Sequence, residues 1–400
     1  MSKSTDIAAL FNQYVMNTYA PTATLTSGSG CKVRDSDGKT YLDFTAGLAV
    51  HNVGHCHHKV VKAVQDQVAT LGHCSNLFYN VNQALLAQRL SKLSLNGKCF
   101  FCNSGAEANE AMIKLARLWG HETGKYEIIT MQNSFHGRTL ATLAATGQAK
   151  VQKGFDPLPI GFTYAEFNNL DSVKAAVNER TAAVMLEVVQ GEGGVLPATE
   201  AFVVGVRKLC DEKGLLMLCD DVQTGMGRTG KWFGWQHFPV KPDAFTLAKA
   251  LADGVPMGAL VASPALSELF KPGMHASTFG GNPISSAAAM AVMDVIEEEA
   301  LVNRAAEAGN LFSEGLNGFV EKYKQVLAVR GMGLMVGLVV EGEAKEVVNT
   351  CRDMGLLCCV AGEHVVRFLP PLNVKDGDLE EALEMIGDAL EQLYGEPEEA

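Results

Sequence analysis

The chain has 400 residues, of which 47% are hydrophobic and 20% are charged, and its formal net charge at pH 7 is −12. This length exceeds what one hydrophobic core usually serves, which excludes a small binding module and predicts one large domain with a smaller one. The negative charge argues against nucleic acid or an acidic membrane surface as a partner, because either would require a basic face.

The first residues and the cysteines indicate a cytoplasmic protein. Residues 1–10 lack a basic region followed by a long apolar core, and no apolar run reaches the roughly 18 residues of a membrane helix. Ten cysteines are too sparse for a disulfide scaffold. Cys99 and Cys102 have CxxC spacing without a second pair, and the contiguous ligands of residues 55–58 would close poorly around one ion. We therefore expect no bound metal.

Short apolar runs after residue 95 predict the strands of a mostly parallel sheet. They cover residues 99–103, 127–132, 182–189, 215–219 and 244–247, with helical segments such as 106–119 between them. Continuous apolar runs separated by helices are typical of a sheet that is covered on both faces. In such α/β sheets ligands bind beyond the carboxyl ends of the strands, so chemically active residues are expected there.

The first strand runs into a candidate anion site. Ser104, Gly105 and Ala106 stand where the strand ends and the helix begins. Unpaired backbone N–H groups and the positive end of the helix dipole attract an anion, and small residues let a phosphate approach closely. An ordinary helix cap at Ser104 would explain the same residues.

The strand at 127–132 is followed by Phe135, His136, Gly137 and Arg138. The aromatic ring could stack on a flat cofactor, and the arginine could hold a carboxylate with two hydrogen bonds. A surface turn without chemistry would also account for this segment.

Two strand ends carry the strongest signal. Asp220 ends the run at 215–219, and Lys249 follows the run at 244–247. A buried lysine whose pKa is lowered can act as a neutral amine toward an aldehyde, as a Schiff base with pyridoxal 5'-phosphate (PLP) requires. That cofactor also needs an acidic partner for its pyridine nitrogen. The alternative is a structural ion pair between the two side chains.

A glycine-rich segment between these strands resembles nucleotide-binding loops but does not fit them. The glycines of residues 225–230 match G-x-G-x-x-G, yet the segment does not open a helix directly after its strand. A Walker A loop requires Ser or Thr after its lysine, and Trp232 follows Lys231. We therefore expect no nucleotide here.

The C-terminal third has a different order of elements. Residues 285–319 indicate a long helical stretch, followed by strands at 333–340 and 365–369 and a final helix at 379–394. We therefore assign residues 51–285 to the large domain and residues 286–400 to the small domain, which the N-terminal segment 1–50 joins.

These segments together resemble the class III aminotransferases of PLP fold type I, and most closely their acetylornithine aminotransferase branch. The matching segments extend along nearly the whole chain and are residues 19–21, 37–44, 104–108, 135–139, 190–194, 223–225, 277–283 and 367–372. The resemblance implies an α/β fold. Its large domain has a mostly parallel seven-stranded sheet flanked by helices, and its smaller domain is α+β.

The resemblance also implies roles toward PLP. Lys249 would form the Schiff base and move the proton between the substrate carbon and the cofactor. Asp220 would keep the pyridine nitrogen protonated, Gln223 would bind the phenolic oxygen, and Phe135 would stack on the ring.

Other residues would hold the phosphate. Gly105 and Ala106 would donate backbone N–H groups to it, and Thr278 would reach it from the partner subunit, which implies an obligate homodimer with shared active sites. The remaining cofactor contacts implied are Ser104, His136, Glu187 and Val222.

Five further residues would bind the substrates. By resemblance, Arg138 binds the carboxylate of acetylornithine and Arg367 the α-carboxylate of glutamate or 2-oxoglutarate. Glu192 would pair with Arg367 when the donor has no carboxylate there. Tyr19 and Ser277 would border the pocket. The implied reaction moves the terminal amino group of N2-acetyl-L-ornithine to 2-oxoglutarate, a step of arginine biosynthesis.

Departures from the family pattern leave alternatives open. Asp221 stands where the family has glutamate, and Val188 stands where it has proline. Succinylornithine, ornithine, 4-aminobutyrate or another ω-amino donor could replace acetylornithine. A non-catalytic PLP-fold binding protein would be expected to have lost Lys249 or Asp220, and both are present.

Overall fold

The structure is a computed structural model and describes residues 4–396. Its largest sheet has seven strands in the order β4 (Lys98–Cys102), β12 (Gly258–Ala262), β11 (Ala244–Leu247), β10 (Leu216–Asp220), β7 (Thr181–Leu186), β5 (Glu127–Met131) and β6 (Phe162–Ala165). Only β12 runs antiparallel to its neighbours. The mostly parallel sheet predicted from the sequence is confirmed, and β6 and β12 are strands that the sequence analysis did not identify.

Helices cover both faces of this sheet because its central strands are apolar on both sides. In β7, Val184 and Leu186 pack with α9 (Glu200–Lys213), whereas Ala183 and Met185 pack with α5 (Gly105–Gly120). Alternate residues of a strand point to opposite faces, so the two helices lie on opposite sides of the sheet. Shorter helices complete this half of the molecule, namely α6 (Leu140–Ala145), α7 (Ala149–Gln152) and α8 (Leu170–Ala176).

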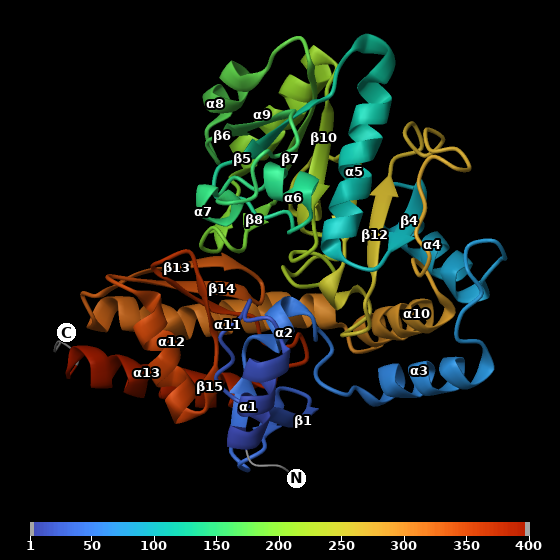
Figure 1. The fold of residues 1–400 in the computed structure, drawn as a ribbon. Coiled ribbons are helices and arrows are strands. Elements are labelled where there is room, and N and C mark those ends of the chain that lie inside the picture. Colours follow the sequence, from blue (N-terminus) through green and yellow to red (C-terminus); the bar gives the residue numbers. More distant parts are fainter. Residues whose placement is uncertain (1–3, 397–400) are drawn as a thin grey trace.

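The C-terminal part forms a second sheet below the first (Figure 1). Its antiparallel strands are β13 (Val326–Met332), β14 (Met335–Val340), β17 (Val365–Phe368) and β16 (Cys359–Ala361). Three helices accompany it, α11 (Leu301–Lys322), α12 (Ala344–Met354) and α13 (Asp376–Tyr394). Figure 1 also shows α10 (Pro283–Glu298) near α3 (His58–Thr70) and α4 (Val81–Leu93), and it contacts both.

Two predicted boundaries are wrong. The stretch at 285–319 is two helices, because Ala300 adopts left-handed backbone angles with φ at 52° and separates α10 from α11. The strand predicted at 182–189 ends at Leu186, and Val189 belongs to β8 (Val189–Gln190), which pairs with β9 (Leu196–Pro197) in a two-stranded ribbon.

The N-terminal segment contacts the C-terminal part directly. It contains α1 (Ser4–Tyr14), β1 (Leu25–Ser29), β2 (Lys32–Asp35), β3 (Thr40–Asp43) and α2 (Ala46–Ala49). Strand β3 pairs in parallel with β15 (Leu356–Leu357), which supports the prediction that residues 1–50 join the small domain. The division at residues 50 and 285 stays a prediction. Within residues 4–396, no helix has both the length and the apolar character needed to cross a membrane.

Candidate active site

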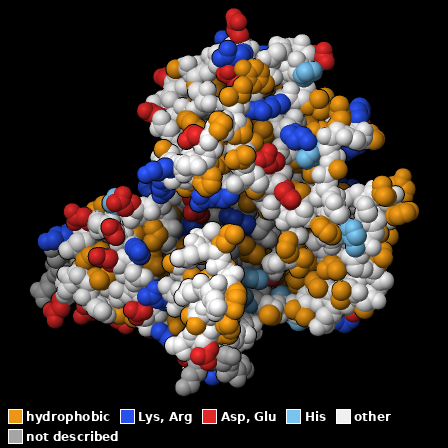
Figure 2. All heavy atoms as spheres, in the orientation of Figure 1, with side chains coloured by type: hydrophobic (Ala, Val, Ile, Leu, Met, Phe, Trp, Pro, Cys, Tyr) orange, Lys and Arg blue, Asp and Glu red, His pale blue; other side chains and the backbone are white. Residues whose placement is uncertain are grey.

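A cavity of about 430 Å3 lies at the carboxyl ends of the large sheet. Its wall is built from residues that follow β4, β5, β7, β10 and β11, as expected for a sheet of parallel strands. Figure 2 shows that Lys and Arg side chains gather in a hollow between the two halves of the molecule. Twelve of the sixteen predicted site residues line the cavity: Ser104, Gly105, Ala106, Phe135, His136, Arg138, Glu187, Glu192, Asp220, Val222, Gln223 and Lys249.

Lys249 follows β11 and adopts left-handed backbone angles, with φ at 46°. Burial, with a smaller contribution from the positive charge of Arg367, lowers the pKa of its amine to about 8. No residue within 4–396 forms a hydrogen bond or an ion pair with this amine, although it lines the cavity. The side chain is therefore placed and tuned to react as a neutral amine.

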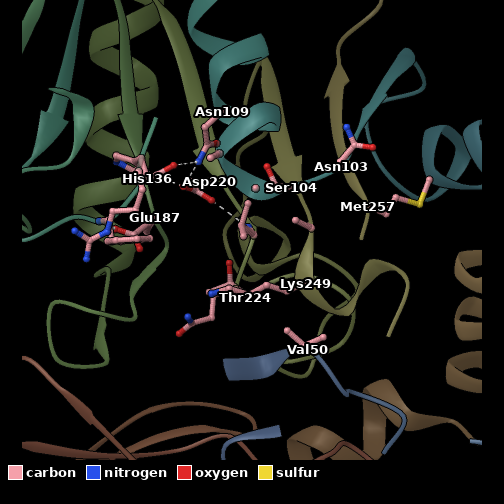
Figure 3. A pocket seen from close by; sticks show the side chains of 18 of the residues that line it. Val50, Asn103, Ser104, Asn109, His136, Glu187, Asp220, Thr224, Lys249 and Met257 are labelled. Atoms are coloured by element: carbon pink, nitrogen blue, oxygen red, sulfur yellow. Dashed lines mark hydrogen bonds and ion pairs between the residues drawn. The ribbon is translucent and has the colours of Figure 1, made fainter. Parts of the chain in front are cut away.

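Asp220 ends β10 and accepts three hydrogen bonds. Its Oδ1 accepts from the backbone N–H of Val222 at 3.1 Å, and its Oδ2 faces Asn109 Nδ2 at 2.7 Å and His136 Nδ1 at 2.8 Å. Figure 3 shows these side chains pointing toward one another. These three donors fix the orientation of the carboxylate. In the described part of the chain Asp220 pairs with His136 and not with Lys249, so the structural ion pair considered above is wrong.

The turn from β4 to α5 combines a helix cap with an open N-terminus. Ser104 Oγ accepts the backbone N–H of Glu107 at 3.2 Å, so Ser104 caps the helix and lines the cavity as well. A Cβ on Gly105 would lie 2.8 Å from Val222 Cγ1, so this turn packs closely against Val222. Gly105 and Ala106 also line the cavity, so the first turn of α5 can offer its unpaired N–H groups to an anion there.

Phe135 and its neighbours form one wall of the cavity. The backbone N–H of Phe135 donates to Glu187 Oε2 at 3.1 Å, and the Arg138 guanidinium lies 5.3 Å from the centre of the Phe135 ring. Burial raises the pKa of Glu187 well above its usual range, and the negative charge of Asp220 raises it further. Glu187 thus avoids placing a second full negative charge beside Asp220.

Arg367 on β17 comes from the other half of the molecule and reaches the same site. Its Nη1 donates to Glu192 Oε1 at 2.7 Å and to Gln223 Oε1 at 3.1 Å, and its Nε donates to Cys359 Sγ at 3.4 Å. Burial raises the pKa of Glu192, but the charge and hydrogen bond of Arg367, with the charge of Lys249, together outweigh burial and lower it below the usual value. The two side chains therefore form a charged pair at the edge of the cavity.

Three predicted residues lie apart from this cavity. Ser277 and Thr278 line a separate hollow beside Asn103, and Tyr19 is 78% exposed. Thr278 was predicted to serve the site of the partner subunit. The roles of all three stay predictions.

The sequence analysis missed the polar group behind Asp220. Asn109 lies on the buried face of α5, and its Oδ1 accepts the Thr246 hydroxyl at 2.8 Å. The sequence does show that Asn109 is a polar residue among apolar ones on the predicted helix after the candidate anion site. Its partner is on a strand more than a hundred residues away, so this signal did not indicate a function.

Comparison with known proteins gives one family. The aminotransferase class-III model matches residues 14–390. The acetylornithine aminotransferase of Caldanaerobacter subterraneus subsp. tengcongensis is 48% identical over 386 residues, covering 95% of this chain and 98% of the relative. A crystal structure of acetylornithine aminotransferase from Elizabethkingia anophelis has a TM-score of 0.87 at 33% identity, covering 98% and 100%. A structure of the Toxoplasma gondii ornithine aminotransferase, described with partial occupancy of PLP at its active site, has a TM-score of 0.92 at 30% identity, covering 96% and 94%.

Proposed function

Because the chain belongs to the class III aminotransferases, and is therefore a PLP-dependent transaminase, we propose that it moves the terminal amino group of N2-acetyl-L-ornithine to 2-oxoglutarate in arginine biosynthesis. One observation carries the proposal. The buried Arg367 is paired with Glu192 at the edge of the cavity that contains Lys249. An arginine whose carboxylate partner is a side chain can exchange that partner for a substrate carboxylate.

The residues present fit PLP. The open first turn of α5 suits a phosphate, the Phe135 ring suits a flat heterocycle, and the Asp220 carboxylate suits a protonated pyridine nitrogen. The turn leaves no room for a Cβ at Gly105. When bound, PLP withdraws electrons from the substrate carbon that carries the amino group, which makes the proton on that carbon acidic.

Lys249 performs two steps with its amine. As a neutral amine it would bind the aldehyde group of PLP. Its side chain lines the cavity, so the unprotonated amine would also be placed to take the proton from the substrate carbon and to deliver it to the cofactor. Its pKa of about 8 keeps a useful fraction of this amine unprotonated near neutral pH.

Arg367 and Glu192 sort the two substrates. A donor with no carboxylate at this position leaves the Arg367 to Glu192 pair intact, so the buried guanidinium keeps a negative partner. With 2-oxoglutarate, Glu192 turns away and the substrate α-carboxylate takes its place on Arg367. Arg138 binds the carboxylate of acetylornithine. Gln223 accepts from Arg367 and binds the phenolic oxygen of the cofactor, so it connects the two parts of the site.

We also propose a homodimer in which Thr278 of each subunit completes the partner's phosphate site. The apolar side chains of Leu77, Phe78 and Tyr79 support this proposal, because they are 84%, 71% and 106% exposed and a second copy of the chain could cover them. We further propose, from the sequence, that the enzyme acts in the cytoplasm without a nucleic acid or membrane partner.

Donor preference tests the proposal. With 2-oxoglutarate as acceptor, kcat/KM should be highest for N2-acetyl-L-ornithine among acetylornithine, succinylornithine, ornithine and 4-aminobutyrate. A higher value for another donor would keep the reaction class and replace the substrate. The absence of amino transfer with all four would overturn the proposal.

A further inference from the structure

The carboxylate of Asp220 is backed by a polar pair that lies inside the protein core. Strands β10 and β11 are in register at Asp220 and Thr246, so both side chains point to the face that α5 covers. Asn109 of α5 lies between them, with its Nδ2 at 2.7 Å from Asp220 Oδ2 and its Oδ1 at 2.8 Å from Thr246 Oγ1. Asn109 and Thr246 are 1% and 0% exposed.

The orientation of the Asn109 amide is fixed by its neighbours. Its Nδ2 also lies 2.8 Å from the backbone carbonyl oxygen of His136, which can only accept a hydrogen bond. The nitrogen must therefore point to that carbonyl and to Asp220, and the oxygen must point to Thr246. A hydroxyl is the donor that this oxygen needs, and Thr246 supplies it. The amide consequently presents an N–H, and never an oxygen, to Asp220 Oδ2.

We propose that Thr246 and Asn109 are positioning residues, which hold the carboxylate of Asp220 directed at the pyridine nitrogen of the cofactor. The proposal rests on the proposed function in one respect, that the bound group is PLP. Without the Asn109 donor the carboxylate can turn away from that nitrogen, which then loses the partner that stabilises its protonated form. Thr246 acts through Asn109, and Asn109 acts through Asp220.

The size of the effect follows from the bonds involved. A hydrogen bond to a charged group contributes roughly 1.5–3 kcal/mol, which corresponds to about 10- to 100-fold in an equilibrium constant. Asn109→Ala removes the donor to Asp220 itself, so PLP should bind about 10- to 100-fold more weakly. Thr246→Val leaves that donor in place but removes the group that orients it, so a loss of about 3- to 10-fold is expected.

Two variants at one position separate the hydroxyl from the packing. Thr246→Val keeps the shape of the side chain and removes the hydroxyl, whereas Thr246→Ser keeps the hydroxyl and removes a methyl group. Thr130 provides a matched control, because it is a buried strand threonine whose hydroxyl has no hydrogen-bond partner among the described residues. Thr130→Val should leave every readout below unchanged.

The experiment uses the full-length protein loaded with PLP labelled with 15N at the ring nitrogen. The dissociation constant of PLP and the 15N chemical shift are measured for the wild type and the four variants. The shift should move toward the unprotonated value in Thr246→Val and further in Asn109→Ala, and stay at the wild-type value in Thr246→Ser and Thr130→Val. Thermal unfolding of the PLP-free variants measures any loss of fold separately.

The outcomes are distinguishable. A shift in Thr246→Ser that equals that of Thr246→Val would assign the effect to packing and overturn the proposal. Wild-type shifts in both Thr246→Val and Asn109→Ala would overturn it as well, while the transaminase assignment would stand. A wild-type protein that does not bind PLP would instead refute the proposed function.

Discussion

Replacement of Arg367 by methionine separates the two halves of the proposed reaction. The guanidinium is 1% exposed and donates to Glu192 at 2.7 Å, and methionine fills similar space without a charge. Two charge-assisted hydrogen bonds to a substrate carboxylate are each worth roughly 1.5–3 kcal/mol. Loss of both, about 3–6 kcal/mol, should lower kcat/KM for 2-oxoglutarate by roughly 100- to 10000-fold. The half-reaction with acetylornithine, which does not use Arg367, should change by less than about tenfold.

Each half-reaction is followed by rapid mixing and cofactor absorbance, with one substrate at a time. Arg138→Met serves as the matched control, because it should slow the acetylornithine half-reaction and affect 2-oxoglutarate less. Equal losses in both half-reactions of Arg367→Met would refute the sorting role and assign Arg367 to the general integrity of the site.

Three further predictions follow from the same site. The neutral amine of Lys249 is the reactive form, and its pKa is about 8. The rate of covalent attachment of PLP to the PLP-free protein should therefore increase up to about pH 8 and level off above it. A rate that still rises beyond pH 10 would contradict the lowered pKa. Burial raises the pKa of Asp221 from 3.8 to about 7. Ionisation of this buried carboxyl should therefore lower the free energy of unfolding as pH rises from about 4 to 7, by up to about 4 kcal/mol. In urea unfolding, Asp221→Asn should make the free energy of unfolding less dependent on pH over that range. Mixed dimers of Lys249→Ala and Thr278→Ala subunits should regain one intact site and be more active than either parent, whereas no gain would mean that Thr278 does not serve the partner's site.

The places of Asp220 and Lys249 in the cavity were predictable because both residues stand at strand ends. Asp220 and Lys249 each follow a continuous apolar run, and parallel strands bring such ends to one edge of the sheet. The direction of β12 was not predictable, because a strand buried on both faces has the same apolar pattern whether it is parallel or antiparallel.

The residues that the sequence analysis missed depend on contacts between distant parts of the chain. Asn109 acquires its meaning only when β10 and β11 are in register and Thr246 lies beside Asp220. The break between α10 and α11 at Ala300 also had no local signal, since neither glycine nor proline marks it. The roles of Tyr19 and Thr278 stay predictions, because neither residue lines the cavity of this chain.

In the most direct test, the visible absorption of the PLP-loaded protein is followed after N2-acetyl-L-ornithine is added without a keto acid. The lysine that carries PLP is then identified by borohydride reduction and peptide mass spectrometry. We expect acetylornithine to convert the cofactor to its amine form, 2-oxoglutarate to restore the original spectrum, and the reduced cofactor to be attached to Lys249. A spectrum that acetylornithine leaves unchanged, or a cofactor attached to another lysine, would contradict this expectation.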